Sequence, residues 1–181
     1  MWTFVFIMLL ITSSVVMKLT IVNSVIKEHK KIFAFVQSEL KGLDTYKGVD
    51  FSKMSEPAVR YVPREKLIEI FMAINEVVYD RMVKEYGQAR VDEMVEMYKK
   101  EVIGITDSND VSEIFIFKDL EPCERKAIVA HEYTHFLQVK ILGKIKLDDK
   151  DKDNKHTYRE MQGGQIQTLY EERFCKDEEA G

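Results

Sequence analysis

The chain has few of the residues that interrupt regular secondary structure. Its 181 residues include only 3 prolines and 8 glycines, whereas Glu, Lys, Ile, Val and Met are frequent. Because proline and glycine disfavour helix interiors, this composition favours a mainly helical protein. The length suits one domain with an appendage and is sufficient for a real core.

Cysteine is also scarce. The two cysteines, Cys123 and Cys175, lie far apart in the sequence and form no CxxC pair. This pattern argues against a disulfide-dense scaffold and against a zinc site made of cysteines. The two thiols can pair with each other or stay free.

No block of like charge and no nucleotide-binding motif is found. Lys+Arg number 27 and Asp+Glu 31, they are interleaved, and the net charge is -4. We therefore expect no nucleic-acid partner, because such proteins carry a basic patch. The motifs GxxxxGK[ST], GxGxxG and GxSxG are absent, which disfavours nucleotide-binding and serine-hydrolase functions.

One long uncharged run is present at the start of the chain. Residues 2–17, WTFVFIMLLITSSVVM, carry no charge, and several lysines follow. With its continuation to residue 26 the run is long enough for a membrane span, so we expect a single-pass, membrane-associated protein. A secretory signal and a buried core helix are the alternatives. The lysines after the run favour a cytoplasmic location for the rest of the chain.

Apolar residues recur at helical spacing in three further segments. Residues 28–42 predict a helix that ends at Gly42, and residues 47–57 are typical of a linker. The segment from Arg64 to about Tyr86 predicts one amphipathic helix, and residues 89–98 predict a shorter one. The expected organisation is a hydrophobic segment over 1–26, a helix and linker over 27–58, and a domain over 59–181.

The second half of the chain predicts a strand between helices. SEIFIFKD (112–119) is the clearest strand, with weaker partners in GVDFSK (48–53) or VIGIT (102–106). A helix begins at EPCER, where Pro122 fits the first turn, and can end at Gly143. Residues 157–174 predict a last helix. The expected fold class is α+β, mainly helical, with a small sheet.

The segment AIVAHEYTHFLQ (127–138) contains the pattern HExxH. On a helix, His131 and His135 project from one face, so their ring nitrogens can reach one metal ion at about 2.0–2.1 Å. Glu132 is rotated by about 100° from His131 and can lie beside the metal as a general base. The surrounding residues are uncharged, which is typical of a buried helix and unlike an incidental surface pair of histidines.

On this motif, His131-Glu132-Tyr133-Thr134-His135, the chain resembles the zincin metallopeptidases. No HExxHxxGxxH follows, so the resemblance is to the gluzincin type, and the size is similar to the minimal gluzincin scaffolds. The resemblance implies a zinc hydrolase that cleaves peptide or protein substrates through a zinc-activated water, with Glu132 as general base. It also implies that the strand SEIFIFKD is the edge strand that binds an extended substrate.

In gluzincins a glutamate from a later helix is the third zinc ligand, and Glu160 is the residue that fits this role best. It follows His135 by 25 residues, which leaves room for a loop and a returning helix. Gly163 and Gly164 follow on the same helix face, where the absence of side chains would allow close helix packing. The rival ligands are His156, Glu171 and Glu172.

Two other functions compete with a zinc peptidase. The first is a degenerate zincin-like protein that binds metal or partners without turnover. The second is a calcium-binding helix-loop-helix, because the segment from Asp149 to Glu160 has acidic residues at positions one, three, five and twelve of an EF-hand loop. Within the peptidase hypothesis, Tyr158, Tyr170 or His156 could stabilise an oxyanion, and a tail carrying Cys175 could cover the zinc.

Overall fold

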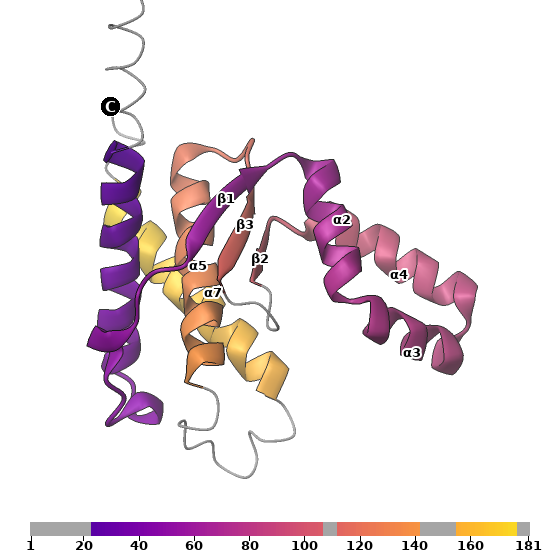
Figure 1. Cartoon of the computed structure of the whole chain (residues 1–181), viewed down its shortest axis with the longest axis horizontal. Helices are drawn as coiled ribbons and strands as arrows, with labels where there is room; N and C mark the ends of the chain where they lie inside the picture. Colours follow the sequence, from indigo (N-terminus) through magenta and orange to yellow (C-terminus); the bar gives the residue numbers. More distant parts are fainter. Residues whose placement is uncertain (1–22, 107–111, 142–154, 177–181) are drawn as a thin grey trace, which may run out of the picture.

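The structure is a computed structural model and describes residues 23–106, 112–141 and 155–176 (Figure 1). It has an α+β, mainly helical architecture with one three-stranded sheet in this part of the chain. In chain order the elements are a helix over residues 23–41, the 3-10 turns η1 (Asp44–Tyr46) and η2 (Phe51–Lys53), β1 (Ala58–Val62), α2 (Arg64–Ile74), α3 (Glu76–Tyr86), α4 (Gln88–Glu101), β2 (Gly104–Thr106), β3 (Glu113–Phe117), α5 (Pro122–Lys140) and α7 (Lys155–Phe174).

Helix α5 forms the centre of the core. It begins with Pro122 in its first turn, as the sequence predicts, because proline needs no hydrogen-bond partner there. The helix lies among the sheet, the helix over 23–41 and α7 (Figure 1). Ten of its residues are consequently buried: Ala127, Ile128, Val129, Ala130, Glu132, Tyr133, Thr134, Phe136, Leu137 and Gln138. The helix that carries the HExxH pattern is thus an interior element.

The helix over residues 23–41 packs one apolar face on this core. Its buried apolar residues are the four that set the predicted spacing, Ile32, Phe33, Val36 and Leu40, and His29 is buried as well. Helical structure ends before Gly42, which confirms the predicted boundary. The segment after it also contributes to the core, because Tyr46 and Phe51 are buried there.

The sheet has the order β1-β3-β2. β1 pairs with β3 in parallel, from Ala58↔Glu113 to Val62↔Phe117, and β2 pairs with β3 antiparallel. The strand β3 predicted from SEIFIFKD is confirmed, but its expected role as an edge strand is wrong, because β3 is bonded on both sides. VIGIT supplies the edge strand β2, whereas GVDFSK forms the turn η2 rather than a strand.

The predicted helix from Arg64 to Tyr86 is instead two helices. Asn75 ends α2 and begins α3, and its side-chain Nδ2 donates a hydrogen bond to the carbonyl of Phe71 at 2.8 Å. This bond occupies a carbonyl at the helix end and marks the break. α4 extends beyond its predicted bounds at both ends, and α2, α3 and α4 project to the right of the sheet in Figure 1.

Helices α5 and α7 form an antiparallel pair. α7 continues through Gly163 and Gly164 without a break, as predicted. Cys123 at the start of α5 forms a disulfide with Cys175 just beyond α7, with the two Cα atoms 5.8 Å apart. The pairing of the two cysteines places Cys175 at the far end of the helix pair from Glu160, so Cys175 does not cover the histidines as proposed for a latent form.

Two predictions concern segments that lie mainly outside the described residues. The expected membrane anchor over 1–26 lies outside the described residues except for its last four. Across the described ranges, none of the helices combines the length and apolar character needed to cross a bilayer. Most of the predicted calcium loop, up to residue 154, also lies outside the described ranges.

Candidate metal centre

The structure brings His131, His135 and Glu160 together between α5 and α7. The Nε2 atoms of the two imidazoles are 2.9 Å apart. The carboxylate of Glu160 approaches both of them, with Oε1 3.3 Å from Nε2 of His135 and Oε2 3.6 Å from Nε2 of His131. Among the described residues, these three side chains form a group that could hold a metal ion.

The spacing of these donor atoms fits a small divalent metal ion. Ligand atoms at about 2.0–2.1 Å from a tetrahedral zinc ion lie about 3.3 Å from one another, and the three distances here range from 2.9 to 3.6 Å. Two imidazole nitrogens and one carboxylate are a common donor set for catalytic zinc. The same set also suits other transition metals, so the group could hold a metal ion but is not specific to zinc.

Two of the three rival ligands, Glu171 and Glu172, do not join this group. Glu171 and Glu172 are on α7 three turns beyond Glu160, where Glu171 accepts a hydrogen bond from Gln167 at 3.1 Å. His156 is in the first turn of α7, where the structure does not describe its side chain. Glu160 is therefore the described acidic residue that reaches both histidines.

Electrostatic contacts keep the Glu160 carboxylate ionised. Hydrogen bonds from His131 and His135 hold the pKa of Glu160 far below its usual range. Burial disfavours protonation of His135, but its hydrogen bond with Glu160 and the charge of Glu132 outweigh that effect and raise the pKa of His135. Glu160 thus stays a carboxylate, which is the form that can bind a cation.

Glu132 lies beside the cluster and is held by strand β2. Its side chain is 6% exposed. The Thr106 hydroxyl donates to Oε2 of Glu132 at 2.7 Å and is 3.1 Å from its backbone carbonyl. At Gly104 the strand passes so close that a Cβ atom would lie 2.6 Å from Oε1 of Glu132. The carboxylate is consequently fixed between α5 and the edge strand.

Gly163 allows α7 to approach His131. A Cβ atom at Gly163 would lie 2.9 to 3.1 Å from three atoms of the His131 ring. Gly164, by contrast, has no atom within 4 Å of its Cβ position. The predicted role in close packing therefore applies to Gly163 and not to Gly164.

A cleft of about 640 Å³ opens at the cluster. Its lining includes the edge strand β2 and apolar residues of α2 and α4, namely Phe71, Ile74 and Tyr98. Arg159, next to Glu160 in the sequence, also lines the cleft. The sequence interpretation missed Gly104, Thr106 and Arg159, because only folding brings them next to the HExxH helix.

Neither tyrosine considered for an oxyanion role lines this cleft. Tyr170 is buried and packs edge-on against Phe35, with ring centroids 5.4 Å apart. The Tyr158 hydroxyl is 2.8 Å from the Thr45 hydroxyl and accepts a hydrogen bond from Gln162. Both hydroxyl groups are absent from the cleft lining, so that interpretation of Tyr158 and Tyr170 is wrong.

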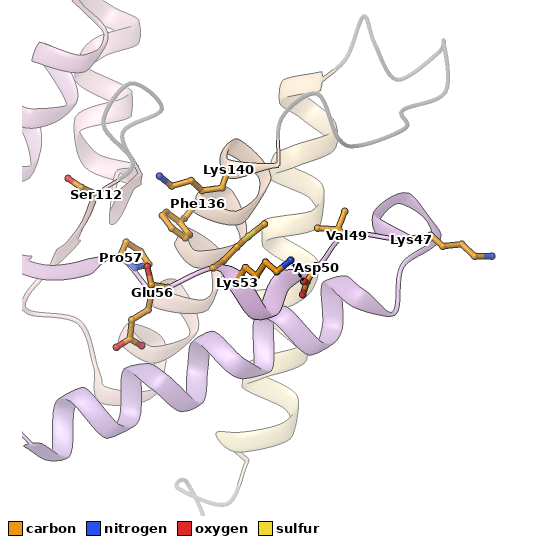
Figure 2. A pocket seen from close by; sticks show the side chains of 12 residues that line it. Lys47, Val49, Asp50, Lys53, Glu56, Pro57, Ser112, Phe136 and Lys140 are labelled. Atoms are coloured by element: carbon orange, nitrogen blue, oxygen red, sulfur yellow. Dashed lines mark ion pairs between the residues drawn. The ribbon is translucent and has the colours of Figure 1, made fainter.

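A larger hollow of about 940 Å³ lies elsewhere, between residues 47–57 and the end of α5 (Figure 2). Its charged residues include Lys53 and Asp50, which form an ion pair of 3.3 Å, and Lys140 beside Phe136. None of His131, His135 and Glu160 lines this hollow. The smaller cleft is therefore the one that contains the candidate metal ligands.

Comparisons with known proteins found no relative of this chain. No family model, curated protein or solved structure matches the chain. The residues of the cleft are therefore the basis for inferring a function.

Proposed function

We propose that this protein is a zinc-dependent peptidase of the gluzincin type. The observation that carries the proposal is the convergence of His131, His135 and Glu160 on one point, with the buried carboxylate of Glu132 beside them and an edge strand along the same cleft. The three ligand side chains would hold the zinc. The zinc, when bound, would supply Lewis acidity towards a peptide carbonyl and an activated water.

Glu132 is the proton carrier in this mechanism. It is next to the metal ligands but does not belong to the ligand group, and the Thr106 hydrogen bond holds one carboxylate oxygen towards β2. A carboxylate in this position takes a proton from the attacking water and delivers it to the leaving amine. Arg159 is the cationic side chain of α7 that lines the cleft and can attract a substrate carboxylate or carbonyl.

Strand β2 offers a place for the substrate backbone. It is at the edge of the sheet, and Gly104, Ile105 and Thr106 all line the cleft. An extended peptide can add to such an edge through backbone hydrogen bonds. Substrate addition is therefore proposed at β2, in place of the β3 strand expected from the sequence.

Cleavage of a peptide library by the full chain, with zinc content measured in the same samples, tests this proposal. Glu132→Gln should keep about one zinc per chain and lose at least about 99% of the activity, because the amide cannot take the proton. Glu160→Ala should lose zinc. Wild-type protein that binds zinc without cleaving any peptide would instead support a metal-binding protein without turnover, and retained cleavage in Glu132→Gln would refute the assigned base.

A further inference from the structure

His135 has a different partner on each of its ring nitrogens. Nε2 faces the metal cluster, 2.9 Å from Nε2 of His131. Nδ1 lies 3.1 Å from Oε1 of Gln138, one helical turn further along α5. Because an amide oxygen can only accept, this contact requires the proton of a neutral His135 on Nδ1 and leaves the lone pair of Nε2 available.

A buried hydrogen-bond network fixes which way the Gln138 amide points. Its Nε2 donates to Oε1 of Gln162 at 2.9 Å, and the Tyr46 hydroxyl donates to the same oxygen. Nε2 of Gln162 in turn donates to the Tyr158 hydroxyl at 2.9 Å. The Tyr158 hydroxyl is 2.8 Å from the Thr45 hydroxyl. With Oε1 of Gln162 accepting from both Gln138 and Tyr46, Gln138 turns its NH2 group to Gln162 and its oxygen to His135.

The side chains of this network are buried, so water cannot replace a hydrogen-bond partner that is lost. Gln138, Gln162 and Tyr46 are 1%, 3% and 1% exposed. Burial makes an unpaired amide costly, so the network holds one orientation. If the Gln138 amide were reversed, its NH2 group would require a lone pair on Nδ1, and the proton of His135 would occupy Nε2, the nitrogen that faces the cluster.

The second histidine lacks such a partner. Nδ1 of His131 is buried, and no hydrogen bond to it is formed by the described residues. Its ring is confined by the backbone of Gly163 instead. The two imidazoles of the metal centre are therefore oriented by different means, one by an amide network and the other by close helix packing.

We propose that Gln138 is a positioning residue of the metal centre, whose amide, oriented by Gln162 and Tyr46, selects the tautomer of His135 that can bind metal. This inference rests on the metal centre proposed above. It links the centre to η1, the segment that follows the helix over 23–41. An outer partner of this kind contributes about 10- to 100-fold to metal affinity.

The tautomer can be measured without metal or catalysis. In the metal-free, histidine-labelled full chain, nitrogen-15 NMR at a pH where His135 is neutral should place its proton on Nδ1. Gln138→Met, which keeps the side-chain length but removes the acceptor, should lose that preference and weaken Zn²⁺ binding about 10- to 100-fold in chelator competition. Gln138→Glu retains an acceptor for Nδ1 of His135 and should keep the Nδ1 tautomer, but it loses the donor to Oε1 of Gln162 and should therefore lower stability.

A matched control separates orientation from general packing. Thr134→Val removes another buried hydrogen bond of α5, from the Thr134 hydroxyl to the Ala130 carbonyl, without touching the network. It should lower stability while leaving the tautomer and zinc affinity unchanged. The inference is overturned if wild-type His135 carries its proton on Nε2, or if Gln138→Met matches wild type in both measurements. A wild-type chain that binds no zinc would refute the proposed function, and the NMR result would still decide whether Gln138 orients His135.

Discussion

The backbone of Gly163 lies against the imidazole ring of His131. A Cβ atom at this position would come within 2.9 Å of Cε1 and 3.0 Å of Nε2, the nitrogen that faces His135. Helix packing and the position of a candidate metal ligand therefore depend on the same contact.

Replacing Gly163 by alanine should displace the His131 ring, because the alanine methyl group would clash with it. Zinc binding should weaken by about tenfold or more as a result. Gly164→Ala is the matched control, since its Cβ position is open. Alanine favours a helix over glycine by about 1 kcal/mol, so Gly164→Ala should raise stability and leave zinc affinity unchanged. Chelator competition and urea unfolding measure both effects. Equal zinc affinities in the two variants would contradict the proposed contact.

Thr106 should affect the chemical step more than metal binding. Thr106→Val removes the hydrogen bond to Oε2 of Glu132, a bond to a charged group worth about 1.5–3 kcal/mol. We expect kcat to fall by about tenfold or more with unchanged zinc content. Thr106→Ser keeps the hydroxyl and should stay near wild type. If the valine and serine variants cleaved peptides equally fast, the hydrogen bond would not contribute to the reaction.

The disulfide should contribute strongly to stability. Cys123 and Cys175 are separated by 52 residues, and closing a loop of this size lowers the entropy of the unfolded chain by an amount worth about 4 kcal/mol. Urea unfolding of the Cys123→Ala/Cys175→Ala variant should show a loss of this order. A reducing agent should destabilise the wild type and have no effect on the double variant. A wild type insensitive to reduction would show that the bond is not formed.

His29 should make stability depend on pH. Burial is the main cause that lowers the pKa of His29 below 6.5, with Glu28 opposing and Arg125 assisting, and its Nε2 lies 2.8 Å from the Tyr61 hydroxyl. The unfolded state then binds more protons, so the stability due to neutral His29 is fully present above about pH 6.5 and is lost as the pH falls from there through the lowered pKa of the folded state.

The corresponding test compares urea unfolding of the wild type and His29→Gln between pH 7.5 and 5. The wild type should lose more stability on acidification than the variant, since glutamine does not titrate. The comparison subtracts the contributions of the other histidines. Parallel pH profiles would exclude a contribution from His29.

Local sequence patterns were sufficient where local forces decide the structure. The apolar spacing in residues 28–42 and the Pro122 helix start are set within a few turns of helix, and both were predicted. The break at Asn75 was missed, because no glycine or proline marks it. Strand β1 was also missed, since it is short, lies between Pro57 and Pro63, and pairs with β3 only through long-range contacts.

The same distinction applies to the site. HExxH places two candidate ligands and a carboxylate on one helix, so their proximity follows from helix geometry alone. Glu160 was chosen from its distance along the chain and the glycines after it, and the structure places it beside both histidines. Gly104, Thr106 and Gln162 gave no signal, because their roles arise from contacts between elements that are remote in sequence.

The disulfide has a further consequence for the integrity of the cleft. His131, Glu132, His135 and Glu160 all lie between Cys123 and Cys175, within one covalent ring. A single cut anywhere between residues 141 and 155 would open this ring but leave both fragments joined. The nicked two-chain molecule would retain every side chain of the site and would separate into two pieces only after reduction.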